Sequence, residues 1–305
     1  MLQLCRTSPA FRSVIGTSVG IGSQGIVFDG TEEQKRRYLP RLATGELIAS
    51  FALTEPGSGS DAASLTTSAR RDGDHYVVNG SKMFITSGMR ADYYTVAVRT
   101  GGPGAGGVSL LLIERDREGF GRTKLKKMGW WASDTAQLFF DNVRVPVDNL
   151  IGPENKGFIG IMLNFNSERL GMAAGAWGYA KVCLDEAIAY ARERHTFGKP
   201  LIANQVVRHR LVDMAMRINA VQSTLELLAY RVGQGEKPVA EICMLKNLAT
   251  STMEYCANEA MQIFGGAGYL RGAKVERIYR ETKVMSIGGG SVEIMKDLAA
   301  RQMGL

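Results

Sequence analysis

Hydrophobic positions recur along the chain with three periods in succession. Residues 1–48 have a helical period, in which Thr31 and Gln34 have the spacing of a capping box at a helix start. From residue 49 to about residue 150, the apolar positions alternate in short runs, as they do in β-strands. The helical period returns after Pro153 and continues to the end of the chain. We therefore predict a helical start, a β-rich middle and a long helical end.

The β-rich middle contains four runs that we predict to be strands, separated by turn dipeptides such as Asp72-Gly73 and Asn79-Gly80. The runs are HYVVNGSKMFIT (75–86), YYTVAVRT (93–100), GVSLLLIERD (107–116) and AQLFFDNVRVP (136–146). Their spacing is typical of a compact β barrel or sandwich. In the helical end, Gly- and Pro-containing breaks separate helices that we predict near 154–194, 203–233, 238–264, 272–286 and 291–303.

This order predicts an α+β multidomain protein with three domains. Residues 1–48 form a partial N-terminal helical domain, residues 49–150 a middle β-barrel domain and residues 151–305 a C-terminal four-helix-bundle domain. With 305 residues, of which 45% are hydrophobic, the chain is long enough to bury a large core. No apolar run reaches the length that spans a membrane.

Charge and composition narrow the classes of function. The formal net charge is +7, but 37 basic residues are mixed along the chain with 30 acidic ones. The single basic run, residues 122–127, contains no aromatic residue, which argues against a nucleic-acid platform. A site for a phosphorylated small molecule would use the same positive excess. We therefore expect a small-molecule ligand and no nucleic acid.

Cysteines and histidines provide no metal site. Cys5, Cys183, Cys243 and Cys256 lie among apolar or small residues without CxxC spacing, which indicates reduced thiols. The three histidines, His75, His195 and His209, are too scattered for a metal cluster, and we interpret them as structural. The first 28 residues imitate a targeting peptide because they contain arginine and no acid. Since their pattern runs directly into the next helix, we favour a bacterial cytoplasm over a mitochondrial matrix.

Two short segments carry the chemistry. FALTEPGSGSD (51–61) arranges hydroxyls and glycines around one proline, which suits a turn that faces a polar, planar ligand. QIFGGAGYLRG (262–272) ends a helical pattern with Gly265-Gly266, where a backbone can approach a phosphate or ribose. Either segment alone is most often an ordinary turn. Because both segments occur in one chain and in this order, they resemble those of the acyl-CoA dehydrogenases.

The resemblance covers essentially the whole chain and implies an oxidoreductase that uses FAD. The implied reaction removes the α-proton of an acyl-CoA thioester and transfers a hydride from the β-carbon to flavin N5, which gives the trans-2-enoyl-CoA. It also implies an electron-transfer flavoprotein as the partner, and a homodimer or homotetramer with shared flavin sites. Family members have a larger helical domain at the N-terminus, so the chain resembles a version that lacks most of it. Helices that lie against that domain would then expose apolar surface.

The resemblance assigns flavin contacts residue by residue. Near the ring, it implies Phe51, Leu53 and Thr54, together with Phe84, Ile85 and Thr86, with Ser60 at a phosphate. RHTFGKPL (194–201) resembles the family segment that reaches the flavin of a partner subunit. The residues implied there, and in the matching segment at 262–266, are Arg194, Thr196, Phe197, Gln205, Gln262, Ile263, Phe264, Gly265 and Gly266. Gly290 and Ser291 complete the set, and Ser60 and Arg169 are implied contacts of the acyl-CoA.

The catalytic base departs from the commonest form of the family. Many members carry it in a Tyr-Glu-Gly-Thr segment, but here the matching text is MSIGGGSVEIM (285–295), which has Gly289 at that position. A second subgroup, similar to the long-chain and isovaleryl enzymes, carries it in a Glu-Arg-Leu segment. NSERLGMAAGAWG (166–178) places Glu168 there. The resemblance thus implies Glu168 as the base and the Gly289 N–H as a donor to the thioester oxygen.

Two alternatives stay open. An acyl-CoA oxidase would share the fold and the flavin but would pass electrons to O₂. A non-catalytic remnant would keep the helical bundle as an oligomerisation or binding module, and it would be colourless when purified. The sequence leaves the length and branching of the acyl group open. The combination of Glu168 with Gly289 favours branched or longer groups.

Overall fold

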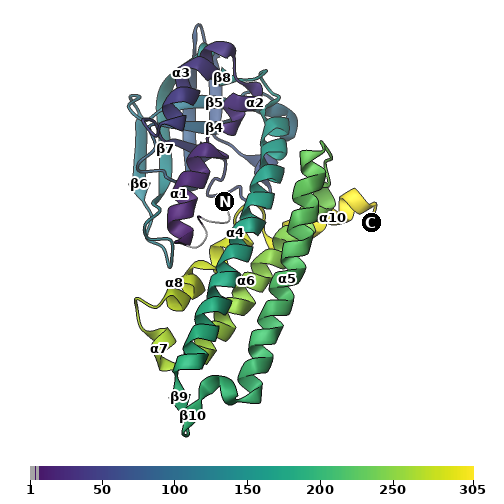
Figure 1. Ribbon diagram of the computed structural model, residues 1–305. Helices are drawn as coiled ribbons and strands as arrows, with labels where there is room; N and C mark the ends of the chain where they lie inside the picture. The colour runs from purple at the N-terminus through teal and green to yellow at the C-terminus, as the bar shows by residue number, and fades with distance from the viewer. Residues whose placement is uncertain (1–3, 5–6) are drawn as a thin grey trace. The chain divides into compact units, whose positions relative to one another are not determined.

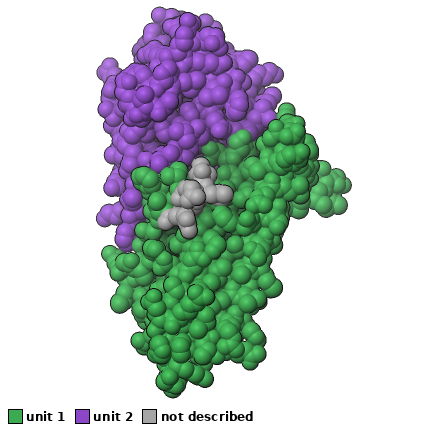
Figure 2. Space-filling view, in the orientation of Figure 1, with its two compact units in different colours: residues 1–12, 166–305 green, residues 13–165 purple. Residues whose placement is uncertain are grey.

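The structure is a computed structural model that describes residue 4 and residues 7–305, and it divides into two compact units. Unit 1 consists of residues 1–12 and 166–305, and unit 2 of residues 13–165 (Figure 2). Unit 2 contains the β-sheet and unit 1 contains most of the long helices (Figure 1). The three domain boundaries expected from the sequence stay a prediction. Cys5 lies outside the described residues.

Eight strands of unit 2 form one sheet. They are β1 (Ala49–Ala52), β2 (Ser68–Asp72), β3 (His75–Thr86), β4 (Tyr93–Arg99), β5 (Val108–Glu114), β6 (Phe120–Lys124), β7 (Thr135–Pro146) and β8 (Leu150–Ile151). The path of hydrogen-bonded neighbours is β6-β7-β3-β2-β4-β5-β8, and β1 pairs with β4 in parallel. The fold thus has the predicted β-rich middle.

All four predicted strands are present, as β3, β4, β5 and β7. The sequence missed the short strands, because β2 (SARRD) and β6 (FGRTK) contain no apolar alternation. The prediction of a turn at Asn79-Gly80 was wrong. Both residues lie inside β3, where the register with β7 shifts between Val78 and Gly80, so the glycine serves a bulge.

Helices α1 (Pro9–Val19), α2 (Gln24–Asp29) and α3 (Glu32–Ala43) form the predicted helical start. The capping box is confirmed: the Thr31 hydroxyl accepts a hydrogen bond from the Gln34 N–H, and the Gln34 side chain accepts one from the Thr31 N–H. The Gln34 amide also donates to the carbonyls of Asp148 and Leu150, so it joins α3 to the end of the sheet.

Each face of the sheet has a buried cluster. One consists mainly of alternate residues of β3, β4, β5 and β7. The other packs the helical start on the sheet, with Ile26, Tyr38 and Leu42 fully or nearly fully buried. Burial of side chains of this size contributes about 1.5–3 kcal/mol each. This packing fixes the strands that carry the first part of the candidate site.

Unit 1 is built from long helices. α4 (Gly157–Glu193) begins in unit 2 and continues through unit 1, followed by the small hairpin of β9 (His195–Thr196) and β10 (Lys199–Pro200). α5 (Gln205–Gly233) packs on α6 (Val239–Phe264), which also contacts α10 (Val292–Met303). The shorter helices are α7 (Gly266–Tyr269), α8 (Lys274–Glu281) and α9 (Lys283–Ile287), and single 3₁₀ turns lie at Ala62–Ser64, Ala105–Gly107, Val147–Asn149 and Leu201–Ala203.

The predicted helices agree with these bounds except at one place. The helix expected at 272–286 is divided at Thr282 into α8 and α9.

Three cysteines of unit 1, Cys183, Cys243 and Cys256, are free and fully buried. Burial raises the pKa of Cys256 to about 12 and also raises that of Cys183 well above its ordinary value. None of the described helices has the length and apolar composition needed to cross a bilayer.

Candidate active site

An exposed aromatic side chain stands on a bulge of β3. Phe84 has a φ of 61° and is 67% exposed, and the register of β3 with β7 shifts between Lys82 and Ile85. A left-handed backbone is rare for a bulky residue and costs about 1–3 kcal/mol, which the surrounding structure must offset. Strain of this kind is typical of functional sites. The bulge turns the Phe84 ring away from the core and leaves it exposed.

The loop Leu53–Ser60, called here the threonine loop, is bonded to this bulge. The Met83 N–H donates to the Thr54 carbonyl at 2.8 Å, and the Lys82 ammonium donates to the Leu53 carbonyl at 2.9 Å. Within the loop, the backbones of Glu55 and Ser58 exchange two hydrogen bonds. The half-buried Thr54 therefore has a fixed place beside the bulge.

A buried ion pair lies behind the threonine loop. The Lys82 ammonium is 2.8 Å from a carboxylate oxygen of Glu55, and both side chains are almost completely buried. Burial lowers the pKa of Lys82 to about 8, against the attraction of Glu55. Burial alone would raise the pKa of Glu55, but Lys82 and donors from Thr66 and Thr67 lower it to about 2. Glu55 thus stays a carboxylate and holds the loop.

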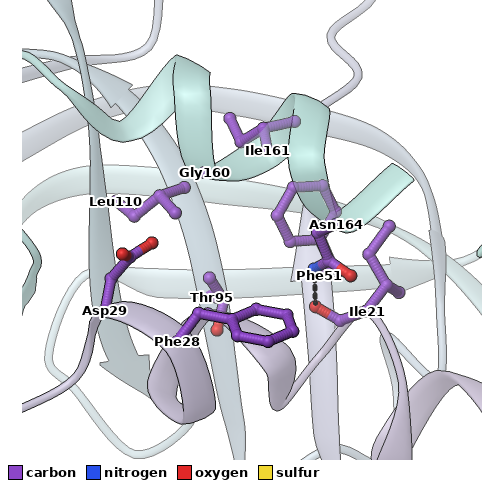
Figure 3. Close-up of a pocket in the computed structure, with 10 residues that line it drawn as sticks. Ile21, Phe28, Asp29, Phe51, Thr95, Leu110, Gly160, Ile161 and Asn164 are labelled. Carbon is purple, nitrogen blue, oxygen red and sulfur yellow. Dashed lines mark hydrogen bonds between the residues drawn. The ribbon is translucent and has the colours of Figure 1, made fainter. Parts of the chain in front are cut away.

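Some predicted ring contacts turn their side chains inward. Leu53 and Ile85 belong to the buried clusters, so only their backbone atoms are available to a ligand. Phe51 lines a small hollow of unit 2, in which the buried Asn164 amide donates to the Ile21 carbonyl (Figure 3). Its volume of about 10 Å³ leaves room for about one water molecule. Of the other predicted contacts in this unit, Thr86 is half-buried and Ser60 is exposed.

In unit 1, the segment Gly288–Gly290, called here the glycine turn, follows the end of α9. Gly289 and Gly290 have φ values of 69° and 104°, which only glycine adopts without strain. The Arg169 guanidinium donates to the Gly289 carbonyl at 3.1 Å, and the Lys246 ammonium donates to the Gly290 carbonyl at 2.8 Å. Two cations from two different helices therefore bind consecutive carbonyls of this turn.

Glu168 lies on α4, one residue before Arg169, and is half-buried. Met172 is one helical turn further along, on the same face as Glu168. A Cβ atom added to Gly289 would lie 2.7 Å from the Met172 sulfur, a distance that real contacts do not reach. The glycine turn thus faces the part of α4 that carries Glu168, and Met172 occupies the space that a side chain at Gly289 would need.

The remaining predicted residues lie at another end of unit 1. The rings of Tyr190 on α4 and Phe264 on α6 stack with centroids 4.2 Å apart, which brings the ends of the two helices together. Phe197 forms the turn between β9 and β10 with a φ of 51° and is fully exposed. The end of α4, directly before the segment at 194–201, therefore lies beside the end of α6 at Phe264. Arg194, Gln205, Gln262, Gly265 and Gly266 are exposed, Thr196 and Phe264 half-buried and Ile263 buried.

The chain has features that fit a flavin. Phe84 and Phe197 are exposed aromatic residues held in left-handed backbone, and each lies in a segment predicted to contact FAD. An aromatic face beside a hydroxyl, as at Phe84 and Thr54, suits a planar heteroaromatic ring. Gly57 and Gly59 have no atoms within 4 Å of an added Cβ, so ligand atoms can approach the backbone there. In the described part of the chain, no group of three or more metal-ligating side chains is found.

Sequence reasoning missed Lys82, Glu55 and Lys246. The signal for Lys82 was its place on the inward face of the strand pattern, in phase with the buried Tyr76 and Val78. Lys246 likewise lies on the apolar stripe of its helix, with Ile242 one turn away. A lysine in phase with core residues is rarely buried unless it has a partner. Ser291, predicted near the flavin, caps α10 by accepting from the Ile294 N–H.

Three family models match the chain in order. They are described as the acyl-CoA dehydrogenase N-terminal domain, at residues 1–46, the middle domain, at residues 50–143, and the C-terminal domain, at residues 155–304. Together they cover nearly the whole described chain. The order of helical start, β-rich middle and helical end is the order of these domains.

Relatives and solved structures agree with the family models. The chain is 40% identical to a mitochondrial isobutyryl-CoA dehydrogenase of Bos taurus, covering 98% of this chain and 71% of the relative. An acyl-CoA dehydrogenase structure from Geobacillus kaustophilus has a TM-score of 0.96 at 40% identity, and the match covers 100% of this chain and 81% of the chain in that structure. An acyl-CoA dehydrogenase complexed with FAD, from Bacillus anthracis, has a TM-score of 0.93 at 33% identity, and the match covers 99% of this chain and 56% of the chain in that structure.

Proposed function

Because this chain belongs to the acyl-CoA dehydrogenase family of FAD-dependent oxidoreductases, we propose that it converts an acyl-CoA thioester to the trans-2-enoyl-CoA with Glu168 as the base. The single observation that carries this assignment is the relation between α4 and the glycine turn. Glu168 provides a half-buried carboxylate on the helix face that meets Gly289. The position at which many relatives carry their base has no side chain here.

Proton abstraction needs a carboxylate that lies close to the reacting carbon of the substrate. Glu293, the other acid close to the glycine turn in sequence, lies in the first turn of α10 and is exposed. The backbone at the start of that helix lowers its pKa, as expected for an acid that stabilises a helix terminus. A side chain at Gly289 would need a left-handed backbone at φ 69° and a shift of the Met172 side chain. Glu168 is thus the best candidate of the three positions.

The thioester oxygen gains negative charge as the α-proton leaves, so a donor must face it. We assign this role to the Gly289 N–H, for which no other group of the described chain serves as an acceptor. The buried Arg169 orients the glycine turn through the Gly289 carbonyl. We therefore assign Arg169 to positioning of the turn and of α4, and place acyl-CoA contact at Ser60, which is exposed.

When bound, FAD supplies the acceptor at N5 for the hydride from the β-carbon. Residues of unit 2 assigned to hold it are Thr54, Phe84 and Thr86, through hydroxyls and the exposed ring. In unit 1, the hairpin turn at Phe197 and the segment Gln262–Gly266 supply exposed aromatic, amide and glycine backbone groups. The exposure of Arg194 and Phe197 in a single chain supports their use towards the flavin of a partner copy.

Self-association is part of the proposal. α5 exposes large apolar side chains on a helix that is otherwise packed on α6, namely Val206, Val212, Met216, Leu227 and Tyr230. Apolar exposure on this scale favours burial in an oligomer, so we propose a homodimer or homotetramer.

We also propose that the electrons pass to an electron-transfer flavoprotein and that the protein works in a bacterial cytoplasm. Because the bovine relative is named for isobutyryl-CoA, we propose a branched acyl group.

The test is anaerobic addition of isobutyryl-CoA, isovaleryl-CoA, butyryl-CoA and palmitoyl-CoA to the purified yellow protein, with flavin absorbance as the readout. We expect bleaching by a branched thioester in the native chain and a loss of about 10³-fold or more in rate in Glu168→Gln. Glu186→Gln is the matched control, since Glu186 lies on the same helix and pairs with Lys274. It should bleach at the native rate.

The alternatives give different results. Equal bleaching in Glu168→Gln and the native protein would remove Glu168 as the base. Rapid turnover with O₂ as the sole acceptor would identify an oxidase. A purified protein without flavin colour, which gains none from added FAD, would favour the binding module.

A further inference from the structure

Lys246 occupies a place that is costly for a charged side chain. It is fully buried on α6, in phase with Ile242, Ala249 and Met253 of the same buried stripe. Its ammonium donates to the Gly290 carbonyl at 2.8 Å. A buried ammonium without a carboxylate in salt-bridge contact is costly, because its desolvation costs several kcal/mol.

The carbonyl that Lys246 binds belongs to the glycine turn. Arg169, which is 4% exposed, binds the preceding carbonyl from α4, and the next residue of α6, Asn247, donates to the Val292 carbonyl at 2.9 Å. The backbone from Gly289 to Val292 is therefore held by three donors from two helices. Glycines at positive φ have the most conformational freedom of any residue, and they need such restraints to keep one conformation.

We propose that Lys246 is a positioning residue for proton abstraction: its ammonium fixes the Gly289–Gly290 backbone so that the Gly289 N–H meets the thioester oxygen. This inference rests on the proposed function, in which that N–H is the donor. A second buried cation also adds positive potential where negative charge develops in the transition state. A rigid turn should therefore affect turnover more than binding of the thioester.

The groups that face Lys246 define its expected pH dependence. Burial, followed by repulsion from Arg169, lowers the pKa of Lys246 to about 8, and Cys243, Glu293 and Glu254 oppose this shift. Burial raises the pKa of Cys243, so its thiol stays protonated where Lys246 titrates. Loss of the ammonium proton should weaken the hydrogen bond from Lys246 to the Gly290 carbonyl. Turnover of the native protein should therefore decline as the pH rises through about 8.

The experiment compares native protein with Lys246→Met and Lys246→Arg, all saturated with FAD. It measures kcat and KM from pH 6 to pH 10 with the thioester that bleaches the native flavin fastest and a dye acceptor. Lys246→Met should lower kcat about 10–100-fold and change KM less than about threefold. Lys246→Arg keeps a cationic donor and should recover kcat to within about threefold, without the decline near pH 8. Lys181→Met, an exposed lysine of α4, is the matched control and should retain native kcat.

Several results would overturn the proposal. They are a native kcat in Lys246→Met, a loss of activity that parallels lost FAD content, and an alkaline decline that persists unchanged in Lys246→Arg. If Lys246→Met does not fold, the comparison of native protein with Lys246→Arg decides the question, and a native profile that is flat through pH 8 refutes the proposal. Failure of the proposed function is distinct, since the native protein would then show no bleaching with any thioester.

Discussion

The buried pair of Lys82 and Glu55 should respond unequally to removal of either partner. The two residues differ in the hydrogen bonds that each keeps when its partner is removed. Without Lys82, the Glu55 carboxylate still accepts from the Thr66 N–H, the Thr66 hydroxyl and the Thr67 N–H, at 2.7–2.8 Å. Without Glu55, the ammonium of Lys82 has only the Leu53 carbonyl at 2.9 Å. We therefore predict that Glu55→Leu destabilises unit 2 more than Lys82→Met does.

The magnitude follows from the pKa of Lys82. Its value of about 8 already includes the attraction of Glu55, which opposes the effect of burial. Removal of Glu55 takes away this attraction and should lower the pKa of Lys82 further, which favours folding of Lys82 as a neutral amine. Release of its proton from an ordinary pKa of 10.5 costs up to about 5 kcal/mol at pH 7, at about 1.4 kcal/mol per pH unit. Lys82→Met should cost about 2 kcal/mol, because the carboxylate retains its other donors.

Equilibrium unfolding in urea measures this difference. In a Trp177→Phe background, the fluorescence comes from Trp130 and Trp131, both of which lie in unit 2. The midpoints and slopes give the free energy of unfolding of this unit. Arg144→Met is the control, since Arg144 forms an exposed pair with Asp72 in the same sheet. It should change the free energy by less than about 0.5 kcal/mol.

Equal losses in the two variants, or a larger loss in Lys82→Met, would refute this reasoning. Either result would show that the threonine donors do not support the carboxylate by themselves. The double variant should lose less than the sum of the single losses, because neither charge is then left alone in the core. An additive double variant would show that the two groups do not interact.

Three further predictions follow from strain and titration. Phe84→Gly should raise the melting temperature of the FAD-free protein, because it relieves about 1 kcal/mol of backbone strain. The same variant should bind FAD about tenfold or more weakly, measured by flavin fluorescence. An unchanged FAD affinity would contradict the assigned contact. Gly289→Ala should lower the melting temperature by the equivalent of about 1–3 kcal/mol, and addition of Met172→Ala should restore part of it, unless the Met172 contact is unimportant. The pKa of Glu55 is lowered from 4.5 to about 2, so its contribution of about 3 kcal/mol is present above pH 4.5 and disappears as the pH falls towards 2. Urea midpoints measured from pH 6 to pH 2.5 should fall less steeply in Glu55→Gln.

The fold was largely predictable because hydrophobic period reports directly on long elements. α5, α6 and α10 begin within two residues of their predicted starts, and β3 has the predicted bounds. β2 and β6 were not predictable in this way, because their pairing is satisfied by backbone bonds while their side chains are charged or small. Asn79-Gly80 shows the opposite error: a local turn signal was overridden by the long ladder between β3 and β7.

The candidate site residues were named through the resemblance and stay predictions, and the groups that support them could not be read from the sequence. Glu168 and Gly289 were assigned through the resemblance, and the Met172 contact that relates them depends on distances between α4 and the glycine turn, about 120 residues apart in sequence. No local pattern reports the left-handed backbone of Phe84, since the bulge arises from pairing with β7. The roles of the buried lysines likewise depend on which carbonyls the fold brings to them.

The buried cysteines of unit 1 allow opening of its helices to be measured by the rate of thiol modification. Cys183, Cys243 and Cys256 are fully buried in unit 1, and burial raises the pKa of each thiol. A thiol in this state reacts with a labelling reagent only after the surrounding helices open. With Cys5 replaced by serine, the rate of modification would report opening of the helical unit, while the sheet, which contains no cysteine, would be silent. The same inaccessibility shields these sulfurs from oxidation while the unit is closed.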